Sequence, residues 1–295
     1  MMPVPGGPDV QETGNRSAEQ GTSLVCYVVA VGRDGPRLRE AADGLTGPEG
    51  SAVRTVSAAG LGALVCDVPA RLYDEEGLKA QLEDLERLEA LARAHHGVVA
   101  DAGEHTGLLP MRLATVYLDD AGAEAMLTGR AEEFDALLGR LEGHVEWGIK
   151  VYADPGQAAA VSRQPPAPSG GSPGRAYLQE RRQQRSTHRD THRAAGAVAE
   201  RVAELAAGFA TDRVAHRPQQ GELASGPGEN VVNDAYLVPA ERGEEFRAAV
   251  GTVAEDVPGV HVEVTGPWAP YSFATPSATP SAAPQPDAGA GGTRE

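Results

Sequence analysis

Runs of apolar residues predict several strands in the first half of the chain. Leu24 to Val31 is apolar almost without interruption, which is typical of a strand covered on both faces. Val53 to Val56 and Leu61 to Val68 predict two more strands, joined by a tight connection at Ala59-Gly60.

Helical periodicity follows these strands. We expect a helix from its cap, Asp74, to about His96, ended by Gly97, with an inward stripe of Leu78, Leu82, Leu85, Leu88 and Leu91. Two further strands are predicted at 98–99 and 113–118, and a second helix from 119 or 120 to 143. Strands followed by helices predict an α+β domain over residues 22–143.

The second half has a different order of elements. His144 to Tyr152 alternates polar and apolar residues and predicts a strand with one buried face. We then expect a long helix at about 175–208, strands at 214–216 and 231–238, a helix at 241–255 and a strand at 260–265. This βαββαβ order predicts a C-terminal ferredoxin-like domain over residues 144–273. The predicted fold class is α+β with two domains.

Three segments are rich in small residues and proline and show no period. Residues 1–21 predict a disordered leader, residues 154–174 a flexible insertion, and residues 274–295 a disordered tail.

The acidic charge of the chain argues against some partners. Among 295 residues, 42 Asp and Glu outnumber 26 Lys and Arg, which gives a formal net charge of −16. Nucleic acids and anionic membranes attract basic surfaces, so neither is an expected partner. We expect neither a secretory signal nor a membrane span.

Cys26 and Cys66 are expected to be buried thiols of a cytoplasmic protein, with a cross-strand disulfide as the alternative.

An aromatic segment follows the last predicted strand. Gly266 and Pro267 are expected to stop that strand. Residues 266–273, here called the strap, carry Trp268, Tyr271 and Phe273. These aromatic side chains either close the core of the protein or form a docking surface for a partner.

The strap also resembles a family signature. Residues 265–273, Thr-Gly-Pro-Trp-Ala-Pro-Tyr-Ser-Phe, are similar to the C-terminal signature of the GvpF/GvpL family of gas vesicle proteins. Stretches 60–69, 109–117, 146–151, 174–178 and 233–238 resemble the same family in the same order. In the second of these stretches, Leu113 and Ala114 stand where the family usually has Phe and Gly.

The resemblance spans about Leu24 to Phe273 and implies a function. It implies a minor, non-enzymatic accessory component of gas vesicles, the gas-filled protein shells of the cytoplasm. Such a protein would bind the hydrophobic major shell protein, together with other accessory proteins, and keep it from aggregating during assembly. The resemblance implies no cofactor.

Arginines form a second candidate contact surface. Arg181, Arg185, Arg189 and Arg193 repeat every four residues along the long predicted helix, accompanied by Arg175 and Arg182. This arginine stripe either pairs with the acids of the protein itself or docks an acidic partner. RNA is a third possibility, which the overall charge disfavours.

The sequence offers few residues for chemistry. His188 and His192 have the spacing of helical metal ligands. The sequence shows no third ligand, and neighbouring arginines disfavour a dication, so we predict no metal site. No set of nucleophile and base is visible, so we expect no enzyme. The alternative to the gas vesicle role is a small-molecule-binding regulatory module built on a ferredoxin-like domain.

Overall fold

The computed structural model describes residues 23–161, 173–219 and 226–274. The predicted leader, the predicted tail beyond Ala274 and residues 162–172 of the predicted insertion lie outside the described residues.

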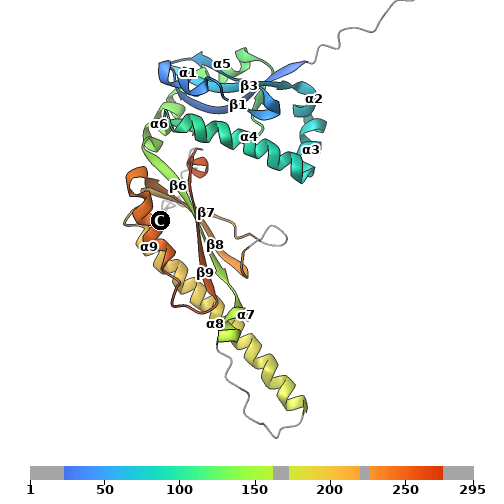
Figure 1. The fold of residues 1–295 in the computed structure, drawn as a ribbon, viewed down its shortest axis with the longest axis vertical. Coiled ribbons are helices and arrows are strands. Elements are labelled where there is room, and N and C mark those ends of the chain that lie inside the picture. The colour runs from blue at the N-terminus through green and yellow to red at the C-terminus, as the bar shows by residue number, and fades with distance from the viewer. Residues whose placement is uncertain (1–22, 162–172, 220–225, 275–295) are drawn as a thin grey trace, which may run out of the picture.

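Two antiparallel sheets form the frame of the described part (Figure 1). The first sheet has the order β2-β3-β1-β4, with β5 also paired to β1. Its strands are β1 (Leu24–Arg33), β2 (Val53–Ala58), β3 (Leu61–Pro69), β4 (Leu108–Pro110) and β5 (Val116–Tyr117). The second sheet has the order β7-β8-β6-β9 and consists of β6 (His144–Ala153), β7 (Asp212–His216), β8 (Glu229–Pro239) and β9 (Val260–Trp268). The mixed α+β fold class is confirmed.

Helices cover both faces of the first sheet. Along β1, Tyr27 and Val29 belong to one apolar cluster, and Cys26 and Val28 belong to another. The first cluster packs on α1 (Pro36–Ala42), α2 (Ala70–Tyr73) and α4 (Leu85–Gly103), and the second packs on α5 (Asp120–Gly129) and α6 (Ala131–Leu141). Both faces of β1 are therefore buried, as its continuous apolar run predicted.

The two cysteines are buried, free thiols. Cys26 and Cys66 lie on neighbouring strands, but the residue opposite Cys66 is Tyr27. The one-residue offset places the two thiols on opposite faces of the sheet, in different clusters. The cross-strand disulfide considered above is therefore wrong, and burial raises the pKa of Cys26 to about 11 and that of Cys66 to about 12.

The second sheet has the predicted βαββαβ order. The helices α8 (Pro173–Ala206) and α9 (Gly243–Gly251) cover one face, where Trp147, Ile149 and Val151 of β6 meet Val198 and Val202 of α8. A short 3-10 helix, η1 (Pro48–Gly50), lies between α1 and β2, and another, η3 (Ala240–Arg242), lies between β8 and α9. The first half of α8 extends beyond the sheet, away from the N-terminal part (Figure 1).

The helix predicted from Asp74 to His96 is wrong in its bounds and its inward face. It is divided into α3 (Glu75–Glu83) and α4, because the carboxylate of Asp84 accepts the backbone N–H groups of the first turn of α4. The helix α4 continues past Gly97, so residues 98–99 are helical and not a strand. Leu82 and Leu85, predicted to point inward, are 48% and 74% exposed.

Other predicted bounds also change. The helix predicted over 119–143 is two helices, α5 and α6, and the strand predicted over 113–118 is only Val116–Tyr117. Residues 155–161, predicted as part of a flexible insertion, form the helix α7 (Pro155–Val161).

The prediction that Gly266 and Pro267 stop the last strand is wrong. The ladder continues to Trp268 through a register shift beside Trp147, a kind of irregularity that tolerates proline.

The two halves share part of their core. Ala235 and Leu237 of β8, together with Phe273, belong to the cluster that contains β1 and α6. The predicted domain boundary at residue 143 falls where the chain passes from α6 to β6 and stays a prediction.

Among the described residues, no helix combines the length and apolar character that a bilayer span requires.

Candidate functional site

The strap leaves the second sheet and packs against the first half of the protein. It ends in the 3-10 helix η4 (Tyr271–Phe273). Phe273 is 2% exposed, and its carbonyl accepts a hydrogen bond from Arg140 Nη2 at 2.7 Å. Tyr271 packs against the cluster around Tyr27, and burial raises the pKa of its phenol to about 12. These two aromatic residues therefore close the core of the protein, which leaves little of them for a partner.

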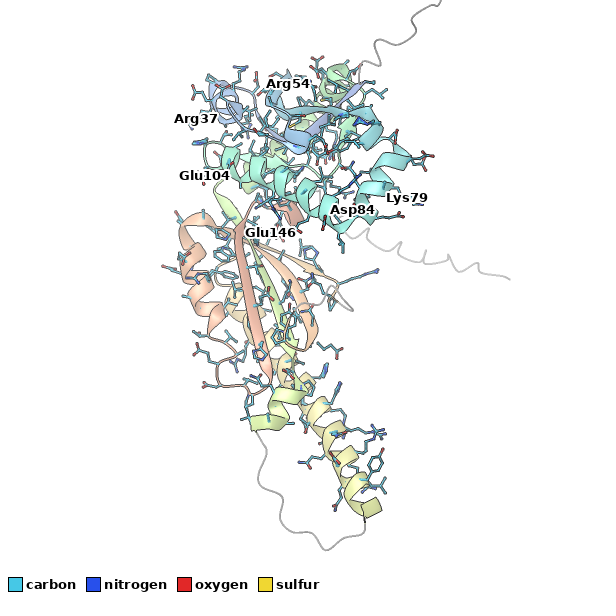
Figure 2. The ribbon with its side chains drawn as sticks, turned by 45° about the vertical axis from the view of Figure 1, so that its right-hand side comes forward. Arg37, Arg54, Lys79, Asp84, Glu104 and Glu146 are labelled. Atoms are coloured by element: carbon cyan, nitrogen blue, oxygen red, sulfur yellow. The ribbon has the colours of Figure 1, made fainter. Side chains whose placement is uncertain are left out.

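Glu146 anchors the strap from the second sheet. This residue of β6 is 9% exposed and lies where the two halves meet (Figure 2). Its carboxylate accepts the backbone N–H of Ser272 at 2.8 Å and the Ser272 hydroxyl at 2.7 Å. Burial raises the pKa of Glu146, although the two hydrogen bonds oppose that effect. The contact joins two of the stretches that carry the family resemblance.

Ser272 also lies beside a histidine, but the arrangement differs from that of a hydrolase. His216 Nε2 is 3.0 Å from the Ser272 hydroxyl oxygen. In a catalytic triad the acid orients the histidine, whereas the carboxylate of Glu146 binds the serine directly. This order of groups fits a polar clamp that holds the strap better than it fits an activated nucleophile.

Of the three aromatic residues of the strap, Trp268 remains open to a partner. Its side chain is 44% exposed, and its ring packs edge-on against His96 of α4, with ring centroids 5.3 Å apart. Leu85, Ala92 and His96 are separated by seven and four residues, so they share one face of α4. Leu85, Ala92, His96 and Trp268 therefore form a strip along α4, here called the α4–Trp268 surface. Sequence reasoning missed this surface because it placed Leu85 in the core.

The arginine stripe lies on the exposed first half of α8. Arg193 pairs with Asp190 at 3.0 Å. The side chains of Arg181 and Arg189 instead contact the Tyr177 hydroxyl and the Arg185 carbonyl oxygen. Within the described residues, Arg181, Arg185 and Arg189 form no ion pair. Within the described residues, the interpretation that the stripe pairs with the protein's own acids therefore holds for Arg193 and not for Arg181, Arg185 or Arg189.

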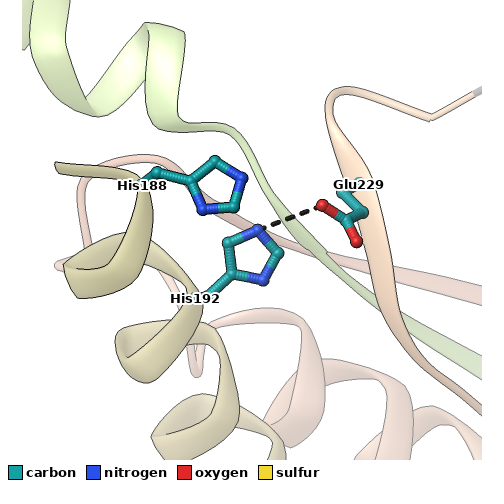
Figure 3. Close-up of side chains that lie close together, drawn as sticks. All are labelled: His188, His192 and Glu229. Carbon is teal, nitrogen blue, oxygen red and sulfur yellow. Dashed lines mark ion pairs between the residues drawn. The ribbon is translucent and has the colours of Figure 1, made fainter. Parts of the chain in front are cut away.

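The histidine pair on α8 has a third group beside it that sequence reasoning missed. Glu229, the first residue of β8, places a carboxylate oxygen 3.1 Å from His192 Nε2. The helix and the strand bring His188, His192 and Glu229 together (Figure 3). No sequence pattern connects Glu229 with the histidines, because packing of α8 on the sheet creates the contact.

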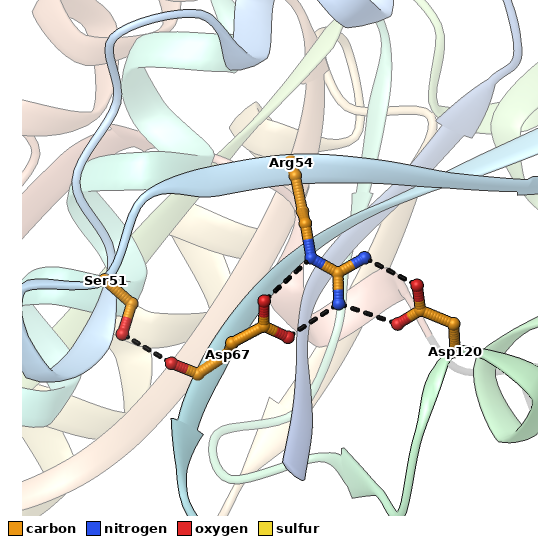
Figure 4. A network of polar contacts seen from close by, with 4 residues as sticks. All are labelled: Ser51, Arg54, Asp67 and Asp120. Carbon is orange, nitrogen blue, oxygen red and sulfur yellow. Dashed lines mark hydrogen bonds and ion pairs between the residues drawn. The ribbon is translucent and has the colours of Figure 1, made fainter. Parts of the chain in front are cut away.

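A charged network on the first sheet has a structural role. Arg54 of β2 donates to both oxygens of Asp67 on β3, at 2.6 and 3.0 Å, and to both oxygens of Asp120 at the start of α5, at 2.6 and 2.8 Å (Figure 4). Ser51 adds a hydrogen bond to the Asp67 carbonyl oxygen at 2.6 Å. The Arg54 guanidinium lowers the pKa of Asp67. The network joins β2, β3 and α5.

A cleft of about 890 Å³ lies between the two halves. Residues of both contribute to it, including Met111, Arg112, Tyr117, His216 and Ser272. Arg130, which also lines the cleft, is paired with Glu133 at 2.7 Å. Its volume has room for a small molecule of the kind that the alternative function requires.

Comparison with known proteins agrees with the sequence resemblance. The family model described as "Gas vesicle synthesis protein GvpL/GvpF" matches residues 25–275. Gas vesicle protein L of Streptomyces sp. (strain CB03234) is 42% identical over 86% of this chain and 94% of its own length. Gas vesicle protein F of the same strain is 29% identical over 84% of this chain and 98% of its own length. The crystal structure of GvpF from Anabaena sp. PCC7120 superimposes with a TM-score of 0.59 at 16% identity, covering 86% of this chain and 97% of that one.

Proposed function

Since the chain belongs to the GvpL/GvpF family of gas vesicle synthesis proteins, we propose that this gas vesicle accessory protein binds the hydrophobic major shell protein before its incorporation. The family match over nearly all of the described fold is the observation that carries this proposal. Binding would take place in the cytoplasm and at the growing vesicle and would require no catalytic step.

The α4–Trp268 surface supports the proposal. A shell protein that is very hydrophobic needs an apolar surface to cover it until it polymerises. Leu85 is 74% exposed, and Trp268 is 44% exposed. A leucine and a tryptophan at the two ends of the α4–Trp268 surface offer an apolar segment two anchors, and aromatic anchors often dominate binding energy.

The charge of the chain supports the same role. A formal net charge of −16 keeps copies of the protein apart by repulsion. A complex with an apolar shell subunit would therefore inherit a soluble exterior, which would oppose aggregation of the subunit.

The arginine stripe would contact a different partner. Arg181, Arg185 and Arg189 are exposed on the extended part of α8 and have no acidic partner within the described residues. Such a basic strip on an acidic protein suits an acidic surface, and we assign it to another gas vesicle accessory protein.

Light scattering tests the anti-aggregation role. Denatured shell protein would be diluted into buffer with and without this protein. We expect the wild type to suppress scattering and the Leu85→Ala/Trp268→Ala double variant to suppress it much less. Leu118→Ala, which changes a leucine that is 85% exposed outside the proposed surface, should act like the wild type. Scattering that is unchanged by the wild-type protein would overturn the anti-aggregation role.

A further inference from the structure

Two histidines and a glutamate form a compact group of metal-binding atoms. His188 and His192 lie one turn apart on α8, and Glu229 begins β8 (Figure 3). One ligand atom from each residue lies within 4.8 Å of the other two. The imidazole rings are stacked, with centroids 4.4 Å apart and an angle of 22° between their planes. Both rings project from α8 towards Glu229 (Figure 3).

The spacing of one pair of these atoms, on His192 and Glu229, suits a tetrahedral ion. Zinc binds imidazole nitrogen and carboxylate oxygen at about 2.0–2.2 Å, which places neighbouring ligand atoms about 3.3 Å apart. His192 Nε2 and Glu229 Oε2 are 3.1 Å apart. Two imidazoles and one carboxylate also leave a fourth position for water, as in zinc sites with three protein ligands.

The hydrogen bonding of His192 also favours a bound ion. Its Nε2 atom is buried and has no hydrogen-bond partner of acceptable geometry within the described residues, although a carboxylate oxygen lies 3.1 Å away. A buried nitrogen without a partner is costly. An ion placed between this nitrogen and the carboxylate would satisfy both atoms.

The neighbouring arginines do not occupy the site. Arg193 is held by Asp190, and the Arg189 guanidinium is held by the Arg185 carbonyl oxygen. Each of these arginines follows a histidine by one residue, which turns it by about 100° around the helix. Arg185, one turn before His188, is exposed. Their charge lowers the affinity for a dication, but within the described residues neither Arg189 nor Arg193 pairs with Glu229.

We propose that His188, His192 and Glu229 bind one divalent transition-metal ion, and we assign zinc because known zinc sites use the same two imidazoles and one carboxylate. The site lies where α8 leaves the second sheet. Ala195 and Val198 are buried against that sheet, whereas Tyr177 and Leu178 are each 58% exposed. A bound ion would tie α8 to the start of β8 and hold the part of the helix that carries Arg181 and Arg185 in a fixed direction.

Isothermal titration calorimetry tests the site. The full chain, purified without a polyhistidine tag and treated with a chelator, would be titrated with zinc chloride at neutral pH. We expect one ion per chain. His188→Gln, His192→Gln and Glu229→Gln should each weaken binding by at least about tenfold. His105→Gln changes an exposed histidine outside the site and should leave binding unchanged.

Hydrogen exchange provides a second measurement. Zinc should slow amide exchange in α8 around His188 in the wild type but not in Glu229→Gln. This readout separates a site that positions α8 from zinc bound elsewhere, and circular dichroism would verify that each variant is folded. The proposal is overturned if the wild type binds no zinc, or if the three substitutions leave zinc binding and exchange unchanged.

Discussion

The carboxylate of Glu146 accepts both the backbone N–H and the hydroxyl of Ser272, at 2.8 and 2.7 Å. These residues lie 126 positions apart in the chain, on β6 and on the strap. The contact fixes the strap to the second sheet while Phe273 fills the core that the two halves share. It therefore links the position of the strap to the junction between the sheets.

Removal of the Glu146 carboxylate should loosen this junction. Glu146→Ala leaves the Ser272 N–H without its acceptor, and we expect a loss of about 1–3 kcal/mol in the free energy of unfolding. Ser272→Ala removes only the hydroxyl donor and should cost about 1 kcal/mol. Because the two groups contact each other, the double variant should cost less than the sum by at least about 0.5 kcal/mol in urea denaturation. Simple additivity would show that the contact contributes nothing of its own.

His95 should make the protein sensitive to acid. It is 2% exposed, with Nδ1 2.9 Å from the Tyr27 hydroxyl and Nε2 3.1 Å from the Met111 carbonyl oxygen. Burial lowers its pKa from 6.5 to about 4. The unfolded chain therefore takes up a proton at a higher pH than the folded one, and folding stability falls as pH drops from about 6.5 towards 4.

The corresponding measurement compares unfolding free energies of the wild type and His95→Gln across this pH range. We expect the wild type to lose roughly 3 kcal/mol more than the variant over the full window. Parallel pH profiles would contradict the assignment of a neutral, buried His95. The sequence predicted a helix end near His96, which would have placed His95 in the last turn; instead α4 continues to Gly103, and the His95 ring is buried.

The Arg54 network should depend on the shape of the guanidinium. Arg54→Ala removes four hydrogen bonds to two carboxylates, and we expect a loss of about 1–2 kcal/mol, reduced by the partial exposure of the side chain. Arg54→Lys should recover little, because an ammonium cannot reproduce two paired contacts. Arg93→Ala, which breaks an exposed helical pair with Glu89, should change stability by less than about 0.5 kcal/mol. Equal stability of the Lys variant and the wild type would disprove the geometric argument.

Position 114 should accept glycine at least as well as the native alanine. Its φ of +60° lies in the left-handed region, which costs an L-residue about 1–2 kcal/mol. Glycine removes that cost and loses about 0.5–1 kcal/mol of chain entropy, so Ala114→Gly should be neutral or stabilising by up to about 1 kcal/mol. In contrast, Ala100→Gly on the exposed side of α4 should destabilise by about 1 kcal/mol. Equal losses for the two variants in thermal unfolding would contradict this account.

The strands were largely predictable from the sequence, since alternation and continuous apolar runs report burial directly. The helix ends were less predictable. Gly97 predicted a helix end, yet Val98 and Val99 pack against the first sheet, and this tertiary contact holds the helix beyond the glycine. The family resemblance was also informative at Ala114, because the usual glycine of that position suits its left-handed backbone.

The candidate sites depended on contacts that no local pattern records. Trp268 meets His96 across the junction of the two halves, and Glu229 meets His192 across a helix and a strand. The aromatic strap was found in the sequence, but its division into buried Phe273 and exposed Trp268 depends on how the second sheet packs on the first.

Co-purification with the major shell protein tests the central claim most directly. Tagged wild-type protein, the Leu85→Ala/Trp268→Ala variant and the Leu118→Ala control would each be co-expressed with the shell protein and recovered under mild salt. We predict stoichiometric recovery of the shell protein with the wild type and the control, and its loss with the folded double variant. Absence of the shell protein from the wild-type sample would contradict direct binding, and full recovery with the double variant would contradict binding through the α4–Trp268 surface.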